Sequence, residues 1–168
     1  MNAANRNDDN PGVRRPDGLW VGRADPSGWA ALADIDSVAV AGDAARRESV
    51  RRWCAEETVL VARDASGPLG YAVLEYGFFE QGFVTMLMVA PGARRRGVGV
   101  RLLAAVEAAC ATEKLFTSTN ASNHPMQLLL RGAGWQPAGL LHGLDEGDPE
   151  LFYRSTRVGP RAGTGPDA

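Results

Sequence analysis

The segment between Phe83 and Thr112 constrains the fold of this chain more than any other. Its apolar run at 83–89 predicts a strand, Ala90-Pro91-Gly92 ends that strand, and an amphipathic helix is predicted at 97–112. The first N–H groups of a helix have no intrahelical partner, and the helix dipole places positive charge there. A strand that leads through a glycine-rich turn into a helix therefore predicts an anion site.

The turn contains the residue types that bind an anion. Charge and fork-shaped donors come from three consecutive arginines, Arg94, Arg95 and Arg96. Gly97 and Gly99 remove side chains where a phosphate would approach the backbone. The turn has no GxxxxGK[ST] phosphate loop, and Arg101 and Leu102 stand where the third glycine of a dinucleotide fingerprint would fall. Taken alone, the turn is also compatible with a solvated arginine cluster at a helix start.

Elements of both kinds alternate along the chain. Strands are predicted at 19–24, 58–63, 69–76, 83–89, 115–119, 136–144 and 151–157. Helices are predicted at 25–36, after the N-cap Asp43, at 97–112, and after a cap at Ser122 or Asn123. This order predicts an α/β (α+β) fold in which helices flank a central, mostly antiparallel mixed sheet.

Length and composition predict one domain and exclude several classes of protein. The 168 residues correspond to a single domain, expected at 19–157 between disordered tails at 1–18 and 158–168. A net charge of −2 gives no general attraction to nucleic acid or to an anionic membrane. No apolar run reaches the roughly 20 residues of a membrane span, and 1–10 lacks a secretory signal. Cys54 and Cys110 have no metal-ligand spacing, so we expect a cytoplasmic protein with two free thiols and no metal.

Two motifs in the chain resemble those of the GNAT superfamily of N-acetyltransferases. Val89-Ala90-Pro91 followed by Arg94-x-x-Gly97-x-Gly99 is similar to the acyl-CoA loop of that family. Its downstream Asn-x-x-Ala-x-x-Leu-Tyr-x-x-x-Gly-Phe segment matches Asn123, Met126, Leu129, Leu130, Gly134 and Trp135. The run 70–73 resembles its third strand, so the resemblance covers about 58–153. It specifies the superfamily and is silent on the acceptor.

The resemblance implies acetyl-CoA as acyl donor, bound in a V-shaped cleft between the fourth and fifth strands. The implied contacts are Leu87, Met88, Val89, Arg94, Arg95, Arg96, Gly97, Val98, Gly99 and Asn123. The pantetheine would pair with the strand at 87–89, and the pyrophosphate would lie on backbone N–H groups at 95–99. A backbone N–H at 88–89 would polarise the thioester carbonyl. The acetyl group would pass directly to a primary amine of a small molecule or a peptide.

The resemblance leaves the proton-transfer groups open. Leu130 stands where many relatives have a tyrosine that protonates the departing thiolate, and Ser122, Asn123 or water are the substitutes. A general base is expected among Glu75, Glu80, His142 and the acidic run 145–148, with Glu80 and His142 ranked first by expected position. Each is also compatible with an ordinary turn or strand role. A non-catalytic acyl-CoA-binding domain is the alternative function, and a homodimer stays open.

Overall fold

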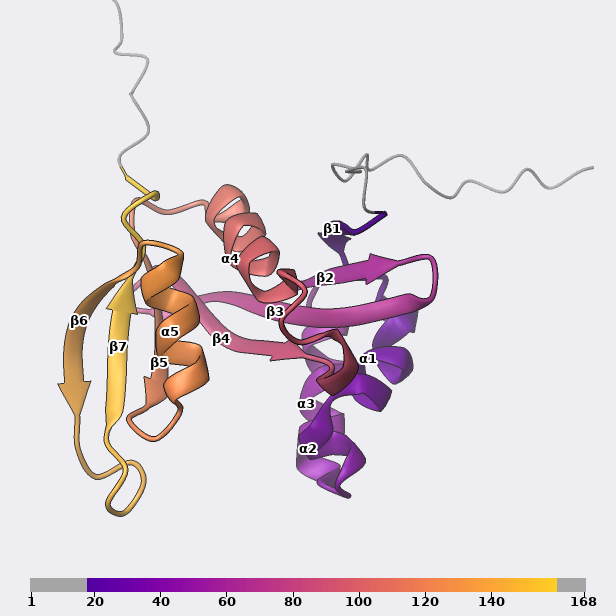
Figure 1. The fold of residues 1–168 in the computed structure, drawn as a ribbon, viewed down its shortest axis with the longest axis horizontal. Coiled ribbons are helices and arrows are strands. Elements are labelled where there is room, and N and C mark those ends of the chain that lie inside the picture. The colour runs from indigo at the N-terminus through magenta and orange to yellow at the C-terminus, as the bar shows by residue number, and fades with distance from the viewer. Residues whose placement is uncertain (1–17, 160–168) are drawn as a thin grey trace, which may run out of the picture.

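A seven-stranded sheet forms the centre of the molecule (Figure 1). The structure is a computed structural model that describes residues 18–159. The strands are β1 (Trp20–Arg23), β2 (Val59–Asp64), β3 (Gly67–Phe78), β4 (Gln81–Val89), β5 (Leu115–Asn120), β6 (Gln136–Leu141) and β7 (Glu150–Arg154). They lie in the order β1-β2-β3-β4-β5-β7-β6, and only β4 and β5 are parallel neighbours. The predicted mixed, mostly antiparallel sheet is confirmed.

Helices cover the two faces of the sheet unequally. They are α1 (Trp29–Ile35), α2 (Ser37–Val40), α3 (Ala44–Ala55), α4 (Val98–Ala109) and α5 (His124–Gly132). Helices α4 and α5 pack on one face, around Leu102, Leu103 and Leu130. Helices α1–α3 pack on the other face of β2–β4, around Val50 and Trp53. Among the described elements, no helix covers that second face where β5, β7 and β6 continue the sheet (Figure 1).

Side-chain caps fix where the helices begin. Asp43 accepts a hydrogen bond from the N–H of Arg46, and Asn123 accepts one from Met126, as predicted for the starts of α3 and α5. The predicted helix at 25–36 is divided, because a 3₁₀ turn at 26–28 precedes α1 and Asp36 ends it. Asp36 then caps the short α2, which the sequence pattern did not predict.

The ends of the chain and the two cysteines complete the comparison with the sequence. The predicted tails lie outside the described residues, except for Gly18, Val158 and Gly159. Val158 packs against the α4 side of the sheet, so the packed region continues past residue 157.

Cys54 and Cys110 are free and buried, as predicted. No helix in the described range has the length and hydropathy needed to cross a membrane, and its acidic, His and Cys residues form no metal-binding group.

Gly70 permits the close approach of β3 and β4. A Cβ built on Gly70 would lie 2.5 Å from the carbonyl oxygen of Met88, which is fixed in the sheet. We therefore expect Gly70→Ala to lower the free energy of unfolding by about 1–3 kcal/mol, measured by urea denaturation. Gly132→Ala is the control, because a Cβ there meets no atom within 4 Å. Equal stability of Gly70→Ala and the wild type would contradict the packing role.

Candidate active site

Strands β4 and β5 part in the middle of the sheet. Their parallel pairing covers only Gly82–Val84 and Leu115–Thr117, although both strands continue. At the point of parting, the hydroxyl of Thr117 donates a hydrogen bond of 2.9 Å to the carbonyl of Val84. Residues 86–89 of β4 pair with β3 on one edge, and within the described sheet their other edge has no strand beside it. This edge is the place where an extended ligand can add to the sheet.

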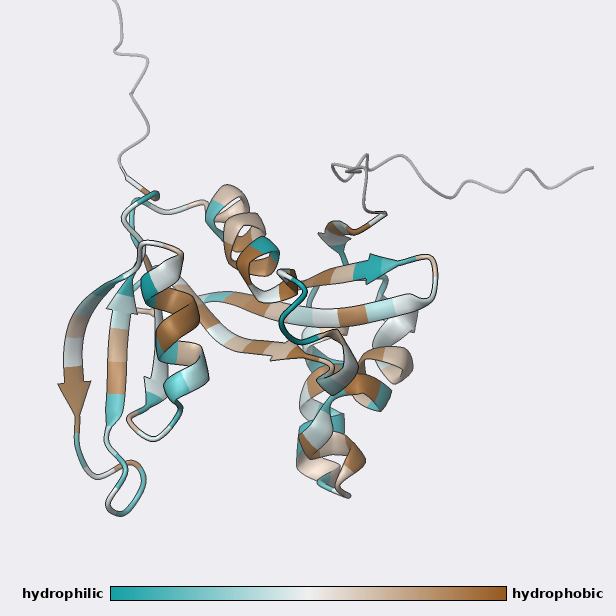
Figure 2. Cartoon of the chain, viewed as in Figure 1, coloured by the Kyte–Doolittle hydropathy of each residue, from teal (hydrophilic) through white to brown (hydrophobic). Residues whose placement is uncertain are grey.

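The turn between β4 and α4 is where the sequence predicts an anion site. A short 3₁₀ helix at 91–93 is followed by the arginines and by Gly97, which caps α4 with a φ of +78°. That left-handed conformation favours glycine. The N–H groups of the first turn, at 98–100, have no acceptor within the helix and lie at its positive end. Figure 2 shows the arginine segment as a hydrophilic stretch directly before α4.

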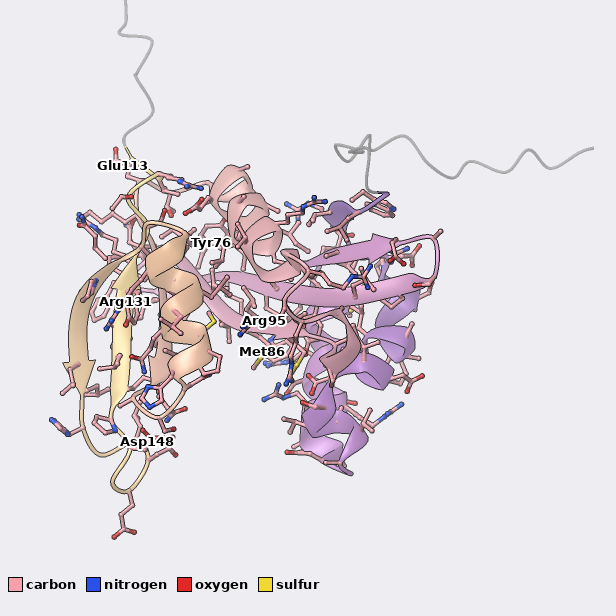
Figure 3. All side chains as sticks on the ribbon, viewed as in Figure 1. Tyr76, Met86, Arg95, Glu113, Arg131 and Asp148 are labelled. Atoms are coloured by element: carbon pink, nitrogen blue, oxygen red, sulfur yellow. The ribbon has the colours of Figure 1, made fainter. Side chains whose placement is uncertain are left out.

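The three arginines of the turn differ in what their side chains contact. Arg96 forms an ion pair of 3.3 Å with Asp64 in the β2–β3 hairpin. The Nε of Arg94 donates to the carbonyl of Val89 at 3.4 Å. Arg95, labelled in Figure 3, is exposed, and no described residue forms a hydrogen bond or ion pair with its side chain. Arg95 therefore keeps its full set of donors for a ligand.

Gly99 has a packing role that the sequence did not reveal. A Cβ on this residue would lie 2.9 Å from a methyl carbon of Leu129 on α5. The absence of a side chain at Gly99 thus allows α5 to pack closely against α4, whereas the sequence suggested that Gly99 makes room for a phosphate. Of the two glycines, only Gly97 keeps open space around the position of a Cβ.

The turn after β5 is bound to the β6–β7 loop. Ser122 donates from its hydroxyl to Asp148 at 2.6 Å, and its N–H reaches the other carboxylate oxygen at 2.9 Å. The side-chain amide of Asn120 donates to Asp145 at 2.7 Å. Figure 3 labels Asp148 in the β6–β7 loop, near the bottom of the view. Two carboxylates of the acidic run are therefore occupied in holding the loop, and His142 is exposed in the same loop.

The remaining predicted proton-transfer positions lie apart from one another. Glu80 is in the exposed β3–β4 turn, where it and Phe79 have positive φ. Thr85 follows Glu80 by five positions, which corresponds to about 16 Å along an extended strand. Leu130 is 0% exposed and packs in the core, so this position offers no proton to the cleft.

A carboxylate that the sequence ranked lower lies beside the parting of β4 and β5. The hydroxyl of Thr85 donates a hydrogen bond to Glu75 on β3. Both residues line an open pocket of about 340 Å³, together with Gly77, Phe78 and Phe83. Thr85 is the extra residue of a β-bulge, because Met86 pairs with Val73 while Val84 pairs with Leu74. A shift of this kind cannot be read from alternation along β4, so no pattern in the sequence favoured Glu75 over the other candidates.

A buried ionic network supports β4 from the other side of the bulge. Asp36 is 0% exposed and accepts a hydrogen bond of 2.6 Å from the hydroxyl of Tyr71 on β3. Arg46 on α3 lies 3.3 Å from the same carboxylate oxygen and 3.3 Å from the sulfur of Met86. The network thus connects α1, α2 and α3 to β3 and to the unpaired part of β4.

The protonation states in this network follow from its contacts. Burial alone would raise the pKa of Asp36. Hydrogen bonds from Tyr71 and from two N–H groups of α2, together with the charge of Arg46, outweigh burial and hold that pKa below its usual value. Burial, reinforced by the Asp36 carboxylate, raises the pKa of Tyr71. Asp36 is therefore charged and Tyr71 neutral at neutral pH.

The geometry agrees with comparisons between this chain and known proteins. The sequence model of the acetyltransferase (GNAT) family matches residues 29–135, which include the α4 turn and most of the sheet. This chain belongs to the GNAT family. No curated protein matches it at a significant level. Membership of the family implies acyl transfer from acetyl-CoA.

Solved structures show how far the GNAT fold extends along the chain. A GNAT-family acetyltransferase from Bacillus cereus is 28% identical, covers 85% of this chain and 99% of its own, and has a TM-score of 0.77. An acetyltransferase from Salmonella typhimurium, solved with acetyl-CoA, is 19% identical with a TM-score of 0.68 over 90% of this chain and 99% of its own. A ribosomal-protein-alanine N-acetyltransferase from Brucella melitensis is 24% identical with a TM-score of 0.67 over 80% and 98%. The two structures below 25% identity support the fold alone.

Proposed function

We propose that this GNAT protein transfers the acetyl group of acetyl-CoA directly to the nitrogen of a primary amine. The observation that supports this most is the parting of β4 and β5, which leaves a strand edge leading straight to the α4 turn. The acceptor is a small molecule or a peptide.

The residues present fit the two ends of acetyl-CoA. The backbone of 87–89 is available for the amide groups of the pantetheine, as an added strand would use it. The N–H groups at 95–99 and the Arg95 guanidinium suit the pyrophosphate, which carries negative charge. Asn123 already caps α5 with its side-chain oxygen, so its amide NH₂ is the group that would donate to the pantetheine.

Bound acetyl-CoA supplies a thioester whose carbonyl carbon accepts a nucleophile. A backbone N–H of β4 would stabilise negative charge that develops on the carbonyl oxygen. The amine lone pair forms the C–N bond, the C–S bond breaks, and its electron pair leaves with the sulfur of CoA. The amine loses a proton to a carboxylate, for which we propose Glu75. The thiolate takes a proton from water or from Ser122, because Leu130 has none to give.

The sequence-based choices Glu80 and His142 stay predictions for the base. Both are exposed, and Glu80 lies at the far end of β4 from the unpaired edge. Glu75 has the better support, because it shares a pocket with Thr85, the first residue of β4 after the parting. From this pocket, the Glu75 carboxylate would reach an amine that is held beside the thioester.

A non-catalytic acyl-CoA-binding domain is the second candidate function. The observation that favours it is the burial of Leu130 in the position of the usual tyrosine. Thiol release from acetyl-CoA in the presence of amines separates the two functions, because only the enzyme releases CoA.

The donor site is tested by calorimetric titration with CoA. We expect Arg95→Ala to raise the Kd for CoA about tenfold or more, since charge-assisted hydrogen bonds to a phosphate are lost. The fold should be unaffected, because the side chain has no described partner. Arg51→Ala is the matched control, an exposed arginine on α3 that pairs only with Glu48 at the surface. Unchanged affinity in Arg95→Ala would contradict the placement of the pyrophosphate, and no binding of CoA by the wild type would overturn the function.

A further inference from the structure

All five phenylalanines of the chain gather on one face of the sheet. They are Phe78, Phe79, Phe83, Phe116 and Phe152, here called the phenylalanine cluster. Phe78 is its centre, with ring centroids 4.8 Å from Phe83, 5.5 Å from Phe116 and 5.8 Å from Phe152. Four of the rings come from the end of β3 and from β4, β5 and β7, which are adjacent in the sheet, and Phe79 lies in the β3–β4 turn.

This face is the one that α1–α3 leave uncovered. Phe83, Phe116 and Phe152 are only half-buried, and Phe79 is 84% exposed. Burying a large aromatic side chain stabilises a protein strongly, so an exposed cluster of this size points to a ligand or a partner. Two of its rings, Phe78 and Phe83, line the pocket that also contains Glu75 and Thr85.

The pocket combines apolar walls with one negative charge. Among the described residues that line the pocket, Glu75 is the only ionisable one, and its carboxylate is already oriented by the hydroxyl of Thr85. A carboxylate attracts an ammonium group and repels an anionic substrate. The volume of about 340 Å³ suits a small molecule of one ring and a short chain. Thr85 places the charged end of the pocket next to the unpaired edge of β4.

We propose that the acceptor is a primary amine that carries an aromatic ring. Its ring packs on Phe78 and Phe83 while its nitrogen lies at Glu75, next to the parting of β4 and β5. This inference rests on the proposed acetyl transfer and adds the class of acceptor. An aromatic ring suits these walls better than an alkyl chain, because offset and edge-to-face ring pairs add to the burial of apolar area.

The test compares 2-phenylethylamine with ethylamine, which has the same amine and no ring. We expect kcat/KM for 2-phenylethylamine to be at least tenfold higher in the wild type. Phe78→Ala should remove most of this difference by raising KM for 2-phenylethylamine, so that kcat/KM falls much more for 2-phenylethylamine than for ethylamine. Phe79→Ala is the matched control, since that ring lies in the same cluster but does not line the pocket. Hexylamine distinguishes an aromatic from a merely apolar preference and should be the poorer substrate.

Calorimetry with CoA present measures binding of the same amines without turnover. If CoA binds and no amine is acetylated, the proposed function fails, while tighter binding of 2-phenylethylamine would still support the aromatic pocket. Equal kcat/KM for the two amines, with acetylation observed, would overturn the acceptor class and leave the proposed function standing. A wild-type dimer that Phe78→Ala converts to monomer, with amine preference unchanged, would also overturn it and assign the cluster to a second copy of the chain.

Discussion

Replacing Asp36 by alanine is expected to lower the free energy of unfolding by about 3–5 kcal/mol. The substitution leaves the Tyr71 hydroxyl and two N–H groups of α2 without their acceptor, and Arg46 loses its counter-ion. Urea denaturation followed by circular dichroism measures the loss. Asp34→Ala is the control, because its ion pair with Arg47 is exposed and worth little. A loss below about 1 kcal/mol for Asp36→Ala would show that the network adds little to the stability of the fold.

The contribution of Asp36 is expected to depend on pH with a defined sign. Its pKa in the folded protein lies below the usual value, so the stability that it provides is present above the unfolded-state pKa of about 3.9. That stability is lost as the pH falls through the folded-state pKa. The gap in unfolding free energy between the wild type and Asp36→Asn should therefore be constant near neutral pH and narrow below about pH 4. A gap that widens toward low pH would contradict the assigned charge state.

Glu75→Gln is expected to lower kcat about a hundredfold or more, the range for loss of a general base. The variant keeps the size of the side chain, so binding of CoA and the folded state should persist. Steady-state rates of thiol release at saturating amine provide the measurement. Glu80→Gln is the informative comparison, because the sequence ranked Glu80 first and the structure places it in the outer turn. A large fall in Glu80→Gln with little change in Glu75→Gln would reverse the assignment.

Local chemistry along the chain predicts the strand, turn and helix around the β4–α4 turn well. The strand, the turn and the helix at 83–112 are specified by neighbouring residues, and caps such as Asp43 and Asn123 act within one helical turn. These elements occur in the structure where the sequence predicts them, with shifts of a few residues at their ends. The geometry of this turn is therefore readable from sequence, although one of its two glycines, Gly99, packs against Leu129. Its role as an anion site stays a prediction.

The acceptor side depends on contacts between distant positions. The buried network joins residues from separate elements, and no spacing in the sequence indicates that they are in contact. These residues are Asp36, Arg46, Tyr71 and Met86. Strand register matters equally, since the bulge at Thr85 decides which face each later side chain of β4 occupies.

A second register shift, between residues 75 and 78 of β3, separates aromatic residues that are neighbours in sequence. Tyr76 accepts a hydrogen bond from the N–H of Ala111, which follows α4, while Phe78 joins the phenylalanine cluster. Of the three neighbouring aromatic residues Tyr76, Phe78 and Phe79, Phe78 is the one that lines the pocket beside Glu75. The acceptor site could therefore not be predicted from the sequence, mainly because a bulge changes the direction of the side chains that follow it.

Acetyl-CoA turnover with primary amines tests the central claim most directly. The purified protein is mixed with acetyl-CoA and either no amine, 2-phenylethylamine or a peptide with a free N-terminus, and released thiol and acetylated product are both measured. We expect thiol release that requires an amine and is matched by an equal amount of N-acetylated product. Thiol release that is independent of amine, or tight binding of CoA without release under any condition, would contradict the assignment as an N-acetyltransferase.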